Sequence, residues 1–321
     1  YVLARAGYRT AAVTDSGFFS RTFQQDQGFQ WFEEVAAGDW NLTRTLERAR
    51  AVRGADDGRP LFLVVHTYRV HGPMRLGPEE DPRPWSAFLA SQKARVEERK
   101  AQGEHVREIA LDLVGEGRRY YLDSVRDLDR KLGTWLAELE AGGFLEHGFV
   151  LLTADHGNAY GEHEDVGHGG KLWDVKLAVP LALRGPGLAA RAERGVVSLI
   201  DVAPTLAELA RVAPSPTWLG RSLLAGAPKR PTFAFKLDKN REFAIFADQR
   251  KVLAPDLAAL AAGAPTHAFD LGNDPGELAN LAGTVDWPRE LAAGLAGALE
   301  PLLVPIAGQD ALELSPELKR P

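Results

Sequence analysis

The chain has 321 residues, which is enough for one large domain or for one domain with a smaller companion. Hydrophobic residues make up 45% and charged residues 26%, as in ordinary globular proteins, and the net charge of -6 does not favour nucleic acid as a partner. No stretch is apolar and long enough to cross a bilayer. The absence of cysteine excludes disulfide bonds but does not identify a compartment.

The first residues have the pattern of a helix followed by a strand. Residues 1–7 look like the last turns of a helix that ends at Gly7, and residues 8–14 are a strand candidate. A chain seldom begins inside a helix that needs packing partners, so we expect the native N-terminus to lie further upstream. Any signal peptide would lie there as well, which leaves the localisation open, with the periplasm and the extracellular space both compatible.

Residues 18–34 are aromatic and irregular, with Phe29, Trp31 and Phe32 close together. Rings in this pattern favour filling of the core over ligand binding. A helix is expected to begin at Asn41, because its side chain can cap the first turn and apolar residues follow at the spacing of one helix face.

Residues 61–65, Leu-Phe-Leu-Val-Val, are predicted to form a buried strand. Two histidines follow it, His66 at the strand end and His71 before a Gly-Pro turn. In open α/β sheets, ligands bind beyond the carboxyl ends of the strands, so a functional site is expected here. A core histidine bonded to the backbone is an equally good interpretation for His66.

The middle of the chain is predicted to be helical. Residues 78–103 are polar and bounded by proline and glycine, with a helical part at 85–100, and we interpret them as an insertion that shapes a substrate mouth. A long helix is predicted over residues 118–141, where apolar side chains recur at steps of three and four residues. A strand at 179–184 and a helix beginning at Asp201 are expected next.

Residues 149–152, Phe-Val-Leu-Leu, are predicted to form a strand that is buried on both faces. The strand is followed by Asp155 and His156, and then by His163 and His168 in a glycine-rich loop. A carboxylate and an imidazole at such an edge can bind a metal ion or an anion. The alternative is a polar loop whose histidines are merely solvated.

The alternation of strands and helices predicts an α/β fold, with a mostly parallel central sheet and helices on both faces. The composition changes near residue 226, and the tail contains β-like pieces at residues 232–237, 243–248 and 267–270. We therefore expect an α/β domain over residues 1–225 and a smaller α+β subdomain over residues 226–321.

Five groups of residues, in this order, resemble the sulfatases, a family of the alkaline phosphatase-like superfamily of metal-dependent hydrolases. They are AGYRTA at 6–11, the strand with histidine and proline at 62–73, the long helix at 121–136 with TADHG at 153–157, the GEH, GHG, LWD and VPL run at 161–181, and the later segments at 201–206 and 269–281. The resemblance covers nearly the whole chain and implies an alkaline phosphatase-like fold.

Carried over residue by residue, the resemblance implies that Asp155 and His156 bind one divalent metal ion. The family favours Ca²⁺, whereas the imidazole at His156 leaves Mn²⁺ and Zn²⁺ open. The same resemblance implies that His71 and His168 are catalytic residues, which contact the sulfate oxygens and help the leaving group to depart.

The resemblance also makes His66 and Lys171 candidates for substrate binding, although a lysine exposed on the surface is the simpler interpretation of Lys171. His163 is expected to be structural or to line the mouth of the site. We expect no role for His105, His147 or His267.

The chain departs from the sulfatase pattern in one respect. The family places two further metal-binding aspartates, and a nucleophile converted from cysteine or serine to formylglycine, before the segment that begins this chain. No Cys-x-Pro-x-Arg or Ser-x-Pro-x-Arg pattern is present in the 321 residues. We therefore expect these 321 residues alone to be inactive and the full-length gene product to be a hydrolase.

The resulting hypothesis is a metal-dependent hydrolase of sulfate esters, acting on a small-molecule or saccharide ester, without nucleic acid as a partner and without a transmembrane segment in this chain. One alternative is a phosphodiesterase or phosphonate monoester hydrolase of the same superfamily. Another is a homologue that binds anions without catalysis. The substrate and the oligomeric state are not encoded in any motif that we recognise.

Overall fold

The computed structural model describes residues 1–15, 17–35, 41–55, 57–71, 83–227, 230–236 and 241–299. These residues pack as two units. The first contains residues 1–169, 178–193 and 198–226, and the second contains residues 170–177, 194–197 and the described part of 227–321. In the described ranges, no helix combines the length and the apolar character that a membrane span requires. The predicted Gly-Pro turn at residues 72–73 and the beginning of the expected insertion lie outside these ranges.

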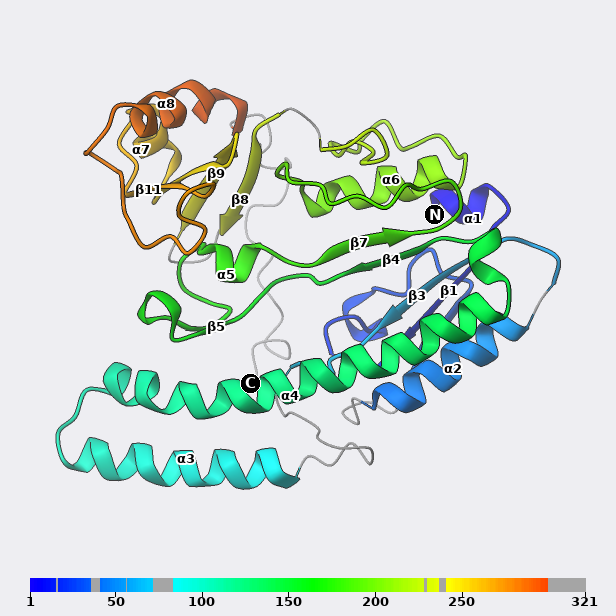
Figure 1. Ribbon diagram of the computed structural model, residues 1–321, viewed down its shortest axis with the longest axis horizontal. Helices are drawn as coiled ribbons and strands as arrows, with labels where there is room; N and C mark the ends of the chain where they lie inside the picture. Colours follow the sequence, from blue (N-terminus) through cyan, green and yellow to red (C-terminus); the bar gives the residue numbers. More distant parts are fainter. Residues whose placement is uncertain are drawn as a thin grey trace. The chain divides into compact units, whose positions relative to one another are not determined.

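A parallel sheet of three strands forms the middle of the first unit (Figure 1), with β1 (Arg9–Thr14) between β2 (Trp31–Glu34) and β3 (Leu61–His66). The small residues Ala11 and Ala12 of β1 are fully buried. They let the layers above and below the sheet approach the central strand closely. The α/β class with a parallel sheet is therefore confirmed, although β2 was not expected.

The strand β4 (Val150–Thr153) pairs antiparallel with β7 (Leu181–Arg184). We expected β4 to be buried on both faces, and this expectation is wrong, because Leu152 is 45% exposed. The reason is that β4 has one partner strand among the described residues, as β3 has in its own sheet. Apolar strands of this kind become buried on both faces only when strands or helices cover every side.

Helices lie on both sides of these strands (Figure 1). On one side are α2 (Leu42–Gly54) and the long α4 (Val106–Ala141), and α6 (Val202–Leu209) lies on the other. As predicted, Asn41 caps α2, because its side chain accepts a hydrogen bond from the backbone N–H of Arg44. The apolar faces of α2 and α4 pack on β1 and β3 through the side chains Ala49, Val52 and Trp135.

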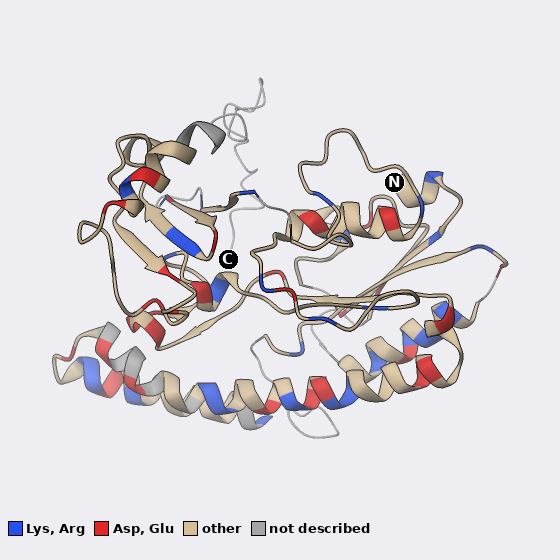
Figure 2. Ribbon diagram, turned by 45° about the horizontal axis from the view of Figure 1, so that its top comes forward, with Lys and Arg blue, Asp and Glu red and all other residues tan. Residues whose placement is uncertain are grey.

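The polar faces of the helices carry both signs of charge. Figure 2 shows lysine, arginine, aspartate and glutamate interspersed along α4 and along α3 (Arg83–Ala101). Mixed charge of this kind is typical of a solvated helix surface. The shorter elements of this unit are α1 (Val2–Arg5), η1 (Arg21–Phe23), η2 (Phe144–Glu146), β5 (Ala159–Tyr160), η3 (Glu162–Glu164), β6 (Val166–Gly167) and η4 (Leu199–Asp201).

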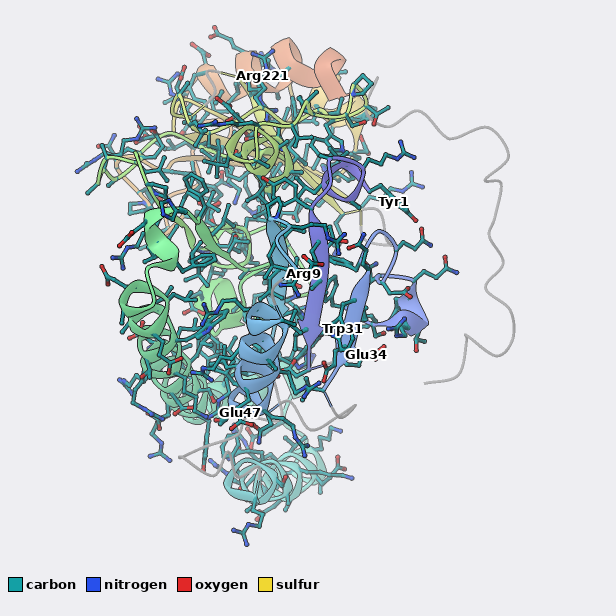
Figure 3. All side chains as sticks on the ribbon, turned by 90° about the vertical axis from the view of Figure 1, so that its right-hand side faces the viewer. Tyr1, Arg9, Trp31, Glu34, Glu47 and Arg221 are labelled. Carbon is teal, nitrogen blue, oxygen red and sulfur yellow. The ribbon has the colours of Figure 1, made fainter. Side chains whose placement is uncertain are left out.

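The aromatic segment 18–34 is divided between core and surface. Phe29 stacks on Phe62 of β3 at 6.3 Å and contacts Phe32 at 6.0 Å, so these rings cover the sheet face opposite α2. Phe18 is 72% exposed, and Trp31 on the edge strand β2 is also exposed (Figure 3). The expectation that Phe29, Trp31 and Phe32 fill the core is therefore right for Phe29 and Phe32 and wrong for Trp31.

The second unit is an antiparallel sheet in the order β11-β10-β9-β8, with two helices on one face. Its elements are β8 (Thr232–Lys236), β9 (Glu242–Ala247), β10 (Arg250–Ala254), α7 (Leu257–Ala261), β11 (His267–Asp270) and α8 (Trp287–Leu299). The segment with α5 (Asp174–Leu177) covers the other face, where Trp173 packs on Phe269. The sequence did not predict β10 or α8.

A buried ion triad ties the second unit together. The ammonium of Lys251 lies 2.8 Å from Asp174 Oδ1 and 2.6 Å from Glu277 Oε1, and Lys251 is fully buried. A buried ammonium is tolerated only when carboxylates replace its hydration shell. The segment at 174 thus belongs structurally with the sheet of the second unit. A division into domains at residues 225 and 226 stays a prediction.

Candidate active site

Three imidazoles from distant parts of the chain meet in the first unit. The rings of His156, just after β4, and His168, just after β6, have centroids 4.6 Å apart. The ring of His71, beyond β3, lies 6.4 Å from that of His168. The sequence predicted this convergence from a shared sheet edge. Among the described residues, however, β3, β4 and β6 belong to three separate sheets.

Asp155 and His156 have the geometry of two ligands to one ion. His156 Nδ1 lies 2.9 Å from the carbonyl oxygen of Gly157, which can only accept, so a neutral His156 carries its proton on Nδ1. Its Nε2 then carries a lone pair that can bind a metal ion, and it lies 3.7 Å from Asp155 Oδ2. Two protein ligands that bind one ion at about 2.1 Å lie roughly 3–4 Å apart. The pair therefore fits a divalent metal ion.

This pair would be only part of a metal site. Asp155 is on the surface, with its side chain 85% exposed, and its other oxygen accepts the backbone N–H of His156 at 2.9 Å. Among the described residues, no group of three histidines, cysteines, aspartates or glutamates is arranged to hold a metal ion. Two ligands alone bind a hard divalent ion weakly, because they leave most of its coordination positions to water.

His66 has features of a core histidine and features of a site residue, the two interpretations that the sequence left open. Its half-buried ring packs against Phe19 at 5.2 Å, and its Nδ1 lies 2.9 Å from Thr14 Oγ1 on the neighbouring strand. Burial lowers the pKa of His66 below its usual value, although the charge of Asp155 opposes the shift. His66 is therefore neutral at pH 7, and it can offer a substrate a hydrogen bond but no charge.

A buried carboxylate shapes the loop that carries His71. Asp15, directly after β1, accepts hydrogen bonds from Thr67 Oγ1 at 2.5 Å and from the backbone N–H of Tyr68 at 2.7 Å. The N–H of His71 in turn donates to the carbonyl of Tyr68 at 2.7 Å. Asp15 thus fixes the turn from which the imidazole of His71 projects. The sequence did not identify Asp15, which looks like one more polar turn residue.

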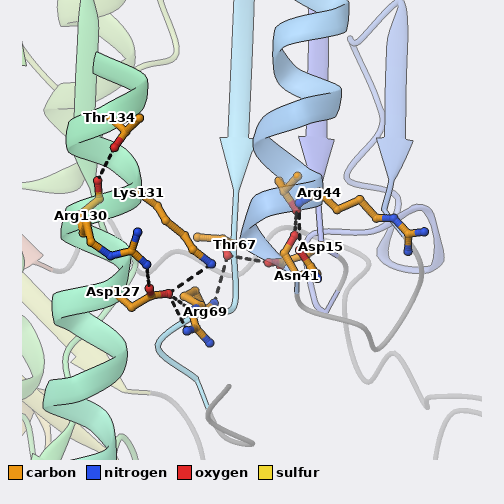
Figure 4. A network of polar contacts seen from close by, with 10 residues as sticks. Asp15, Asn41, Arg44, Thr67, Arg69, Asp127, Arg130, Lys131 and Thr134 are labelled. Carbon is orange, nitrogen blue, oxygen red and sulfur yellow. Dashed lines mark hydrogen bonds and ion pairs between the residues drawn. The ribbon is translucent and has the colours of Figure 1, made fainter. Parts of the chain in front are cut away.

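The same loop is clamped to α4 by a buried ion pair (Figure 4). Arg69 is 1% exposed, and its Nε and Nη2 donate to Asp127 Oδ2 at 3.1 and 2.6 Å. Lys131 Nζ is 3.3 Å from the same oxygen. Burial works to raise the pKa of Asp127, but the hydrogen bond from Arg69 and the charges of Lys131 and Arg69 outweigh it and hold that pKa below its usual value.

Arg69 and Asp127 were missed by reasoning from the sequence. A signal was available for Asp127, because it lies on the face of α4 that also carries the buried Ser124 and the half-buried Leu128. A carboxylate among inward-facing residues needs a partner. No local pattern identifies Arg69 as that partner.

Lys171 lies in the second unit. Its Nζ is 3.1 Å from His267 Nε2 and 5.4 Å from the centre of the Trp173 ring. An ammonium has donors and no acceptor, so in this contact the ring nitrogen of His267 is the acceptor. A role for Lys171 in substrate binding stays a prediction.

Comparison with protein-family models matches residues 1–212 to the family described as Sulfatase. The chain belongs to the sulfatase family. All of the candidate site residues, from His66 to Lys171, lie within the matched part of the chain, and the resemblance deduced from the motifs is confirmed.

Curated relatives of this chain are substantially longer. Arylsulfatase K from Mus musculus is 29% identical over 185 residues, which cover 51% of this chain and 32% of the relative. The multifunctional alkaline phosphatase superfamily protein PehA from Trinickia caryophylli is 27% identical over 280 residues, covering 74% of this chain and 54% of the relative. The chain thus spans about a third to about half the length of these relatives.

Solved structures share the fold of this chain. A protein in complex with its substrate D-glucosamine-2-N,6-O-disulfate has a TM-score of 0.66 and 18% identity, covering 94% of this chain and 80% of that chain. A protein in the alkaline phosphatase superfamily from Vibrio parahaemolyticus has a TM-score of 0.56 and 17% identity, covering 92% and 66%. The predicted alkaline phosphatase-like fold is confirmed by these similarities.

Proposed function

We propose that the protein containing this chain hydrolyses sulfate esters with the help of a divalent metal ion. Membership of the sulfatase family supports hydrolysis. The observation that carries the proposal is the meeting of His71, His156 and His168 beside the carboxylate of Asp155. Three imidazoles and one carboxylate form a site that can bind both a cation and a tetrahedral oxyanion.

His71 and His168 are the proposed catalytic residues. As the ester bond breaks, negative charge moves onto the leaving oxygen, and a protonated imidazole within hydrogen-bond reach can neutralise it or transfer a proton to it. His66, neutral and half-buried, would orient one sulfate oxygen through a hydrogen bond. Lys171 is the second proposed contact with the substrate.

The metal ion would be held by Asp155 Oδ2 and His156 Nε2, together with ligands from outside the described residues. When bound, the ion would polarise the sulfate oxygens as a Lewis acid. Ca²⁺ is the ion that we propose, with Mn²⁺ and Zn²⁺ as the alternatives that an imidazole ligand favours. Within this chain, the Nδ1–H to Gly157 hydrogen bond prepares His156 for that role by fixing its tautomer.

The nucleophile is proposed to come from polypeptide outside these 321 residues, as a formylglycine. Two facts support this. The chain contains no cysteine and no serine in a maturation pattern, and it spans only about half or less of its curated relatives. We accordingly propose that the 321-residue chain is inactive by itself.

The proposed substrate is a small-molecule or saccharide sulfate ester. Relatives named as arylsulfatases, and a solved structure with a sulfated glucosamine as its substrate, support this class. A phosphonate monoester hydrolase from Silicibacter pomeroyi shares the fold with a TM-score of 0.59 at 15% identity, so phosphonate esters are the substrates to compare.

The test is a hydrolysis assay with the purified full-length gene product. With a divalent metal ion present, it should release 4-nitrophenol from 4-nitrophenyl sulfate much faster than from 4-nitrophenyl phenylphosphonate, and the 321-residue chain alone should release none. Faster hydrolysis of the phosphonate would contradict the proposal and identify the protein as a phosphonate monoester hydrolase. Sulfate binding without hydrolysis of either ester would instead identify an anion-binding homologue.

A further inference from the structure

Two phenylalanine side chains beside the candidate site are exposed to solvent. Phe18, in the loop after β1, is 72% exposed, and Phe23 in η1 is 46% exposed. Their ring centroids are 4.9 Å apart, so they form one continuous aromatic surface, which we call the Phe18–Phe23 rim. Large aromatic side chains that are exposed to water contribute favourable binding free energy when an apolar ligand covers them.

Tyr68 connects this rim directly to the imidazoles. The backbone N–H of Phe18 donates to Tyr68 Oη at 2.9 Å. The ring of Tyr68 packs edge-on against His71, with centroids 5.0 Å apart, and against His66, with centroids 5.1 Å apart. The rim is therefore one residue removed from the proposed catalytic His71.

The loop that carries the rim is held in place on both sides. Gly17 has a positive φ of 76°, and a side chain there would lie 2.0 Å from a ring carbon of Tyr68, so only glycine allows this close approach. The next aromatic residue, Phe19, turns inward and contacts Phe32 at 5.5 Å. Phe19 thus anchors the loop while Phe18 points away from the core. A surface fixed in this way loses little conformational entropy when a ligand covers it.

We propose that the Phe18–Phe23 rim binds the organic leaving group of the sulfate ester, and that this protein therefore selects esters whose leaving group has a flat apolar face, such as an aryl ring. The inference rests on the proposed function, because it places the sulfate among the imidazoles. A sulfate ester has an anionic head and an organic group, and continuity through Tyr68 makes the rim the adjoining surface for that group. Stacking on an aromatic face tolerates a range of rings.

The experiment compares two sulfonates that cannot be hydrolysed, methanesulfonate and naphthalene-2-sulfonate. Each is titrated into the 321-residue chain at pH 6, and binding is followed through the NMR signals of the imidazole protons. Naphthalene-2-sulfonate should bind the unaltered chain about tenfold more tightly than methanesulfonate. Phe18→Ala should remove most of that preference, Phe23→Ala should remove part of it, and neither should change the affinity for methanesulfonate.

The matched control is Phe235→Ala in β8, which removes another half-exposed phenylalanine and should leave the preference intact. A preference for the naphthyl probe that survives Phe18→Ala would overturn the inference. So would a sedimentation measurement in which Phe18→Ala converts a dimer into a monomer, or a loss of binding to anionic lipid vesicles, because the rim would then serve a second copy or a membrane. If neither sulfonate shifts the signals of His71 and His168 in the unaltered chain, the proposed anion site itself fails.

Discussion

Replacing Asp127 by asparagine should lower the free energy of unfolding by about 3–5 kcal/mol. The substitution keeps the volume of the side chain but leaves the guanidinium of Arg69, which is 1% exposed, without an ionised partner. Removing one member of a buried ion pair is costly because the other remains charged and desolvated. Urea denaturation at pH 7, followed by tryptophan fluorescence, measures the change.

The matched control is Asp123→Asn, one turn earlier on the same helix. Asp123 pairs with Arg126 on the surface, at 2.7 Å, so its replacement should change the stability by about 0.5 kcal/mol or less. Replacing both buried charges together, as Arg69→Met with Asp127→Leu, should cost less than Asp127→Asn alone. Equal effects of Asp127→Asn and Asp123→Asn would show that the clamp on the His71 loop contributes nothing.

Replacing His168 or His71 by alanine in the full-length gene product should lower kcat for 4-nitrophenyl sulfate by about 10²–10⁴-fold. The reason is that each substitution removes an imidazole that is proposed to hydrogen-bond to the sulfate group at the stage where charge develops on the leaving oxygen. Steady-state kinetics at saturating substrate measures the change, and circular dichroism checks that the variants are folded.

His147 supplies the control for these variants. It directly follows η2, ahead of β4, whereas Asp155 and His156 follow the opposite end of that strand. His147→Ala should retain full activity. An undiminished kcat for His168→Ala, or a rise in KM alone, would remove His168 from the chemistry and leave it at most a substrate contact.

Much of the fold and the core of the site could be predicted because their signals are local. The apolar run at 61–65 and the polar residues that end it mark β3 and its histidines within a dozen residues. The run at 149–152 and Asp155 mark the second half of the site in the same way. The convergence of His71 on His168 was expected from the rule that ligands bind beyond the carboxyl ends of strands, rather than from any direct sequence signal.

The features that the sequence did not show depend on partners distant in the chain. Arg69 and Asp127 are separated by 58 residues, and each looks like an ordinary surface charge until the other is placed beside it. Lys251 likewise breaks the apolar pattern of β10. Its burial is possible because the carboxylates of Asp174 and Glu277 offset the loss of hydration of its ammonium group. Trp31 was wrongly expected in the core, because an aromatic segment alone does not reveal which ring faces water.

The claim on which the proposal rests is that Asp155 and His156 begin a metal site that His71 and His168 adjoin. The most direct test is to add Mn²⁺ in small steps to the metal-free full-length gene product, which supplies the remaining ligands, and to record the NMR signals of the imidazole protons, which a bound paramagnetic ion broadens according to distance. The signal of His156 should broaden first, followed by those of His168 and His71, while that of His147 stays sharp. A sharp His156 signal, or equal broadening of His147, would contradict a metal-binding role for this pocket.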